Sequence, residues 1–248
     1  MRPVILHYHL FKNAGTSIDA NLKASFGDGW ENYDHPQGHT ISAEAIRDKF
    51  EQTPSLIALS SHDAAPPLPQ GNFKLFPIVV LRHPIVRAHS AYAFECGKQL
   101  GLEQPEISFA EYVRERLNDL DGGVITNFQC CRLANQSPQG PDTGPAKPAP
   151  TTVQQAQAFI ASLETFGLVE AFDTTIARLQ RYLEPHFPGL EWRNQWQNAT
   201  NHTPSPIPQR VSEIERELGS ELFLRLCQRN QLDLDLYAFA AQRFYHTA

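Results

Sequence analysis

The chain has 248 residues, of which 41% are apolar, and this length and composition predict one folded domain spanning residues 1–248 and exclude a disordered chain. Its formal charge of −6 argues against a nucleic-acid partner, because proteins that bind nucleic acids are usually basic. No apolar run reaches the roughly 20 residues that a membrane-spanning helix needs, so we expect no integral membrane segment.

The first predicted element is a strand that leads through a tight turn into a helix. An apolar run at residues 4–6 predicts the strand, and residues 18–24 are compatible with the helix. The turn between them, residues 9–17, ends close to the start of this helix. A helix N-terminus offers unpaired backbone N–H groups and the positive end of a dipole, which together suit a phosphate or a sulfate.

The side chains of this turn fit the same purpose. Gly15 would let the backbone approach an anion closely, and Lys12 adds a mobile positive charge. Thr16 and Ser17 could cap the helix and donate hydrogen bonds from their hydroxyl groups. The turn therefore predicts an anion-binding site, and the alternative is a capped strand-to-helix turn with an incidental lysine.

Four histidines come early in the chain. Residues 27–40 read as a loop, and within it His35 and His39 have a spacing that would suit a metal only on a helix. The proline and the glycine between them disfavour a helix, so we expect no metal site there. His7 and His9 would share one face of the first strand, and we interpret both as packed or hydrogen-bonded side chains.

The next elements are a helix, a buried strand, a loop and a third strand, at residues 42–51, 56–60, 64–72 and 76–81. Strands separated by helices predict a parallel sheet, whose ligands gather beyond the carboxyl ends of the strands. The turn of residues 9–17, Ser61-His62 and Arg82-His83 all follow such ends. We therefore expect these three polar clusters to converge on one rim of the sheet.

A helix is predicted to follow the third strand, with Pro84 in its first turn. Arg87 and Ser90 are three residues apart on it and would face the same way, while Arg82 lies just before it. Arginine binds phosphate through two parallel hydrogen bonds, and a serine hydroxyl can add another. Next to the anion-binding turn, this segment predicts phosphate binding, although either arginine could instead be a surface charge or an ion-pair partner.

The rest of the chain is predicted as a broken helical region, an exposed loop, a helix, a strand, a helix and a helical tail, at residues 106–134, 135–150, 152–163, 166–170, 174–183 and 210–246. The exposed loop is either a lid over a substrate or an inert insertion. The cysteines show no zinc or C-x-x-C spacing, and the first strand begins too near Met1 for a signal peptide. We therefore expect free thiols in a cytoplasmic protein.

Two motifs carry a family resemblance, H-L-F-K-N-A-G-T-S at residues 9–17 and L-R-H-P-I-V-R-A-H-S at residues 81–90. They resemble the H-I-P-K-T-G-G-T-S and L-R-D-P-x-x-R-x-x-S signatures of sulfotransferases that use 3'-phosphoadenosine 5'-phosphosulfate (PAPS), in particular the carbohydrate 2-O- and 6-O-sulfotransferases. Four shorter segments in the family's order extend the similarity over nearly the whole chain: residues 126–129, 166–173, 198–201 and 232–237. Asn13-Ala14 departs from Thr-Gly, with a slight expected effect on the turn, and His83 departs from an acidic residue.

The resemblance implies a P-loop-like, three-layer α/β fold with a central parallel sheet flanked by helices and a helical C-terminal part. It also implies a set of residues that hold PAPS and its product, 3'-phosphoadenosine 5'-phosphate (PAP): Lys12, Asn13, Ala14, Gly15, Thr16 and Ser17 for the 5'-phosphosulfate, Arg82 and Ser90 for the 3'-phosphate, and Thr200 and Asn201 for the nucleotide. His62 matches the family's proposed catalytic base.

The expected reaction is in-line transfer of the sulfo group to a hydroxyl of a small molecule or saccharide. His62 would accept the hydroxyl proton, Lys12 would stabilise the negative charge that develops, and no metal is needed. A small-molecule kinase is one alternative, but a Walker A loop places lysine directly before Ser or Thr, whereas Lys12 precedes Gly15. A catalytically silent nucleotide-binding module is the other, and the presence of both His62 and Lys12 speaks against it.

Overall fold

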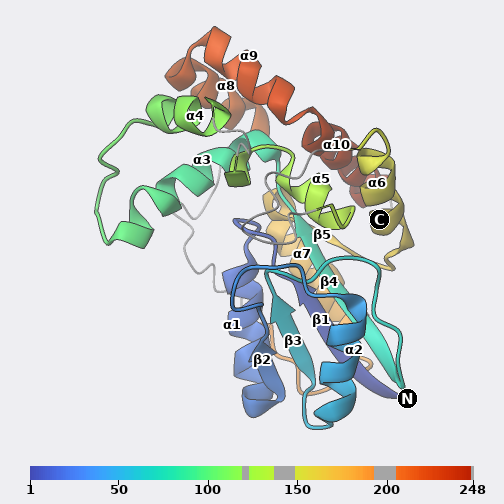
Figure 1. Cartoon of the computed structure of the whole chain (residues 1–248). Coiled ribbons are helices and arrows are strands. Elements are labelled where there is room, and N and C mark those ends of the chain that lie inside the picture. The colour runs from blue at the N-terminus through green and yellow to red at the C-terminus, as the bar shows by residue number, and fades with distance from the viewer. Residues whose placement is uncertain (119–122, 137–148, 193–204, 247–248) are drawn as a thin grey trace.

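The computed structural model describes residues 1–118, 123–136, 149–192 and 205–246. At its centre lies a parallel sheet of five strands in the order β2-β3-β1-β4-β5 (Figure 1). The strands are β1 (Arg2–Tyr8), β2 (Trp30–Asn32), β3 (Ala58–Ser61), β4 (Phe73–Leu81) and β5 (Gly167–Leu168). Helices cover both faces of this sheet, so the predicted three-layer α/β class is confirmed.

Two groups of helices form the outer layers. The helices on one face are α1 (Gly15–Phe26) and α7 (Phe172–Leu183). Those on the other face are α2 (Ala43–Gln52), α5 (Phe128–Leu133), α6 (Thr152–Ser162) and α10 (Gln231–His246). Because both faces are covered, the central strands are apolar along nearly their whole length, as parallel strands usually are.

Strand β1 shows how the alternation of side chains distributes the core. Val4, Leu6 and Tyr8 pack with the helices of the α2 side, whereas Ile5 packs with α1 and α7. His7 continues the Ile5 face, since side chains of a strand alternate between its two faces. The strand thus delivers a buried imidazole to the side of the sheet on which α1 lies.

A third apolar cluster lies beyond the carboxyl ends of the strands (Figure 1). It is built by α3 (Pro84–Glu95), α4 (Phe109–Asn118), α8 (Ile207–Leu218) and α9 (Ser220–Arg229). The predicted helical C-terminal part is therefore confirmed as α8, α9 and α10. Short 3₁₀ helices complete the described elements: Gly27–Gly29, Lys98–Leu100, Gly123–Ile125 and Val169–Ala171. None of the described helices combines the length and the apolar character that crossing a membrane requires.

Two predicted segments differ from the structure. Residues 27–40 contain the edge strand β2, which is only three residues long and too short for its alternation to stand out in the sequence. The strand predicted at 166–170 is limited to β5, and a 3₁₀ helix follows it directly. The Thr175 hydroxyl lies 2.9 Å from both the N and the O of Leu168, so a side chain satisfies the backbone at the strand's end.

Ala14 occupies a left-handed backbone conformation at the start of α1, with φ 63° and ψ 17°. The expectation that alanine affects this turn only slightly therefore understates its cost, because a residue with a Cβ atom is disfavoured in the left-handed conformation. We expect Ala14→Gly to raise the free energy of unfolding by about 0.5–1 kcal/mol in urea titrations. Ala20→Gly, inside the same helix, should lower it by about 1 kcal/mol. Equal losses in the two variants would contradict the strain at Ala14.

Candidate anion-binding site

The turn between β1 and α1 is hydrogen-bonded to both strands that flank β1, which are β3 and β4. The N–H of His9 donates to the carbonyl of Ser61 at 2.8 Å. The side-chain amide of Asn13 is buried, and its nitrogen lies 2.8 Å from the carbonyl of Val80 and 2.7 Å from Oε1 of Gln129. The structure therefore uses the Asn13 side chain to fix the turn against the end of β4.

Helix α1 begins at Gly15, and its N-cap is Ala14, which makes no side-chain capping bond. The prediction that Thr16 or Ser17 caps this helix is wrong, because both lie inside its first turn. Thr16 is exposed and Ser17 is buried. Since the N-cap residue is an alanine, which has no side chain to cap the helix, this N-terminus is suited to an external anion.

Gly15 has a packing role that the sequence does not reveal. A Cβ atom at this position would lie 2.1 Å from Cδ2 and 2.2 Å from Nε2 of His9, closer than any real contact. The glycine is therefore needed by the imidazole that packs beneath the turn. Its predicted role, a close approach of the backbone to an anion, remains a prediction.

Lys12 is half-buried, and its ammonium group lies 4.3 Å from the centre of the Phe94 ring. Burial, together with the nearby positive charges of Arg82 and Lys98, lowers the pKa of Lys12 to about 8. An anion next to this amine would favour its charged form and so raise its pKa again. The lysine is thus placed where a negative ligand would be stabilised.

Arg82 joins the two motifs directly. Its Nη1 donates to the backbone carbonyl of Lys12 at 2.9 Å. Burial lowers the pKa of Arg82 to about 10, and the positive charge of Arg210 contributes, whereas Glu170 offsets part of the shift. Its Nε atom is buried without a hydrogen-bond partner among the described residues. These cations therefore repel one another, and an anion would relieve that repulsion.

Arg210, in α8, is a cation that sequence reasoning missed. Its charge lowers the pKa of Arg82, His83 and His89, so it faces the same region. Only its position in a helical tail was readable from the sequence, and helical periodicity alone does not bring the tail to the rim. Burial lowers the pKa of His83 to about 4, with a further contribution from Arg210, so this imidazole adds no charge near pH 7.

Arg87 does not face the site. It is completely buried, its Nη2 lies 3.9 Å from Oδ2 of Asp233, and its guanidinium lies 4.8 Å from the centre of the Phe128 ring. The prediction that Arg87 and Ser90 point together toward a phosphate is therefore wrong for Arg87, because α5 and α10 pack against its side of α3. Ser90 is half-buried further along α3.

Gln129 links the two motif loops. Its Oε1 accepts from Nδ2 of Asn13 at 2.7 Å and from the N–H of Arg82 at 2.9 Å, and its Nε2 donates to the carbonyl of Arg82 at 2.9 Å. Nearby, Glu170 accepts from the N–H of His83 at 3.0 Å and from the hydroxyl of Tyr237 at 2.9 Å. Three of the shorter segments that resemble the family thus contact each other or the second motif.

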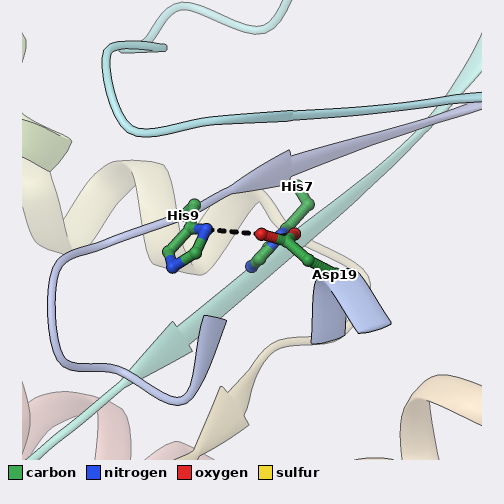
Figure 2. A group of neighbouring side chains, drawn as sticks. All are labelled: His7, His9 and Asp19. Carbon is green, nitrogen blue, oxygen red and sulfur yellow. Dashed lines mark hydrogen bonds and ion pairs between the residues drawn. The ribbon is translucent and has the colours of Figure 1, made fainter. Parts of the chain in front are cut away.

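The imidazoles of His7 and His9 and the carboxylate of Asp19 lie together beside the turn (Figure 2). Asp19 of α1 lies 2.7 Å from Nδ1 of His7 through one oxygen and 2.7 Å from Nδ1 of His9 through the other. The interpretation of both histidines as packed or hydrogen-bonded side chains is confirmed, since His7 is hydrogen-bonded to Asp19 and the buried ring of His9 packs against other imidazoles. The rings of His9 and His62 stack with their centres 3.9 Å apart, so His62 contacts the first residue of the turn.

His7, His9 and Asp19 are the one group of three metal-ligating side chains found among the described residues, with ligand atoms within 4.8 Å of one another. Two ligands on one tetrahedral zinc ion lie about 3.3 Å apart, given bonds of roughly 2.0–2.1 Å. The 2.7 Å separations in this cluster are shorter than that and are typical of direct contacts between imidazole and carboxylate, of which the one from His7 is a hydrogen bond. As it stands, the geometry favours Asp19 as the carboxylate that orients two imidazoles.

The expected convergence on one rim is confirmed for the described residues. Strands β3, β1 and β4 are neighbours in the sheet, and Lys12, His62 and Arg82 all follow their carboxyl ends. Thr200 and Asn201 lie outside the described residues.

The fold and the site together define a three-layer α/β protein with a cationic strand-to-helix turn at the carboxyl edge of its sheet. No family model matches the chain. It is 28% identical over 250 residues to an uncharacterized protein of Archaeoglobus fulgidus, a similarity that covers 95% of each chain.

Proposed function

We propose that this protein is a sulfotransferase that moves the sulfo group of PAPS to a hydroxyl of a carbohydrate or glycoconjugate. The observation that carries the proposal is the contact between the two motifs, in which Arg82 donates to the carbonyl of Lys12 near the N-terminus of α1, whose N-cap alanine makes no side-chain capping bond. The resemblance of both motifs to PAPS-dependent enzymes adds a second, independent support.

Each end of the donor has a suitable partner in this proposal. The amide groups that open α1 and the ammonium of Lys12 would hold the 5'-phosphosulfate. Arg82 and Ser90 would hold the 3'-phosphate, and the unpartnered Nε of Arg82 supports this role. During transfer, Lys12 would stabilise the charge that grows on the bridging oxygen.

The acceptor hydroxyl would lose its proton to His62. Its side chain is 43% exposed, so a substrate can reach it, and its ring stacks on His9 beside the turn. A neutral imidazole accepts protons near physiological pH. The loops at residues 27–40, 64–72 and 135–150 are the segments proposed to shape the acceptor pocket; of the third, residues 137–148 lie outside the described residues.

Calorimetric titration with PAP at several pH values tests the donor site. We expect affinity about tenfold weaker at pH 9 than at pH 7, because bound PAP needs Lys12 charged and its free pKa is about 8. Lys12→Met should weaken binding and abolish this pH dependence. Lys23→Met, at an exposed position of α1, should bind PAP as the unaltered protein does.

A screen of hydroxyl acceptors with radiolabelled PAPS then tests transfer. Labelled product from a saccharide or a small molecule would support the proposal. Tighter binding of ATP-Mg than of PAP would instead indicate a kinase. Binding of PAP without transfer to any acceptor would indicate a nucleotide-binding module.

A further inference from the structure

We propose that Asp34 is a positioning residue for His62, holding its imidazole in the tautomer that presents a free lone pair at Nε2. This inference rests on the proposed function, in which His62 is the general base. Asp34 was not identified from the sequence, where it falls inside the segment read as a loop, residues 27–40.

Asp34 contacts His62 through both of its carboxylate oxygens. Its Oδ1 accepts from the backbone N–H of His62 at 2.7 Å, and its Oδ2 lies 3.1 Å from Nδ1 of the same residue. The side chain of Asn32 donates to Oδ2 at 2.7 Å and so fixes the carboxylate in turn. Because β2 and β3 are neighbours in the sheet, the residues just beyond their carboxyl ends meet at the same rim.

The chemistry of these contacts decides the tautomer. A carboxylate can only accept, so Nδ1 must carry the proton and Nε2 must carry the lone pair of the neutral ring. Nε2 takes part in none of the hydrogen bonds found among the described residues. The ring of His9 stacks on the ring of His62 and so helps to fix its orientation. The His9 ring itself packs against Gly15.

The carboxylates around His62 raise the pKa of its imidazole. The hydrogen bond to Asp34 raises the pKa of His62, and the negative charges of Asp34, Asp19 and Asp63 add to it, while burial opposes the shift. Burial would raise the pKa of Asp34, but the hydrogen bonds from His62 and Asn32 outweigh it and hold that pKa below its ordinary value. Burial lowers the pKa of His9, whereas that of His62 is raised, so His62 is the more basic of the two stacked imidazoles.

The imidazole nitrogens of ¹⁵N-labelled protein report the tautomer without any need for activity. In long-range proton–nitrogen spectra, with His62 assigned from the signals lost in His62→Ala, we expect the Nδ1–H form and a pKa above 6.5. In Asp34→Asn the amide can donate to Nδ1, so the Nε2–H form should dominate and the pKa should fall to 6.5 or below. Asp28→Asn removes the same charge from an exposed position of the preceding turn and should change neither.

Transfer kinetics give the second readout. Asp34→Asn should lower kcat by roughly 10²-fold or more, with the affinity for PAP and the acceptor KM nearly unchanged. An Nε2–H tautomer in the unaltered protein, or an unchanged tautomer and pKa in Asp34→Asn, would overturn the positioning role. If the unaltered protein does not transfer sulfate to any acceptor but the spectra follow the expectation, the proposed function fails while the positioning of His62 by Asp34 stands.

Discussion

His62→Ala leaves PAP binding intact while sulfate transfer falls by roughly 10²–10⁴-fold, the loss that removal of a general base typically causes. We expect the two effects to separate because His62 follows β3, whereas Lys12 and Arg82, the proposed donor-binding residues, follow β1 and β4. The part of the turn that His62 contacts is the ring of His9. Since its side chain is 43% exposed, truncation should cost little stability. Steady-state transfer rates and PAP titrations at the same pH measure both quantities.

His186→Ala is the matched control for this variant. His186 lies just after α7 and contacts Lys74 and Phe76, near the amino end of β4 and away from the rim. Its replacement should leave transfer and binding unchanged. Near-normal turnover in His62→Ala would remove His62 from the mechanism, and lost PAP binding would show that its ring helps to form the donor site.

Asp233→Ala lowers the free energy of unfolding by about 3–5 kcal/mol, the cost of leaving one member of a buried ion pair without its partner. The side chains of Arg87 and Asp233 are both 0% exposed. Asp233 also accepts from the backbone N–H of Cys130 at 2.7 Å and of Gln129 at 3.2 Å. Removing the carboxylate thus strands a buried guanidinium and two buried N–H groups.

Urea titration of three variants tests this. Asp235→Ala, at an exposed position of the same helix, should stay within about 0.5 kcal/mol of the unaltered protein. Arg87→Met combined with Asp233→Ala should recover part of the loss, because no unpaired charge remains. A loss in Asp233→Ala no larger than that in Asp235→Ala would mean that the pair carries no such weight.

Burial sets the cost of this pair. It raises the pKa of Asp233 and lowers the pKa of Arg87, which shows that both groups lose hydration when the chain folds. The pair therefore adds little net stability compared with apolar side chains, although breaking it is expensive. The pair helps to position the two motifs. Asp233 accepts from the backbone N–H of Gln129, and the side chain of Gln129 accepts from both Asn13 and Arg82.

The arrangement of the rim could be predicted because it follows from local patterns. Apolar runs separated by helices predict parallel strands, and the residues just after those strands, such as Lys12, His62 and Arg82, must then meet. The helix carrying Pro84 and the helical tail were readable for the same reason. These predictions use only the spacing of apolar residues and the rule that strands separated by helices form a parallel sheet.

What stayed hidden depends on contacts between distant segments. Nothing local distinguishes Arg87, which is buried, from Arg82, which reaches the turn, because the difference is made by α10 far along the chain. Asp34 and Arg210 were missed for a similar reason. Each lies in a segment whose local pattern gives only loop or helix, while its role depends on which neighbour the sheet or the helical cluster brings beside it.

The contact between Gly15 and His9 changes what a glycine in such a turn can be taken to mean. Here the absent side chain makes room for a protein group, so the residue would be required even if no nucleotide ever bound. A glycine at the start of a helix is therefore no signature of phosphate recognition on its own. In this molecule the glycine is required because the imidazole of His9 occupies the space of a side chain.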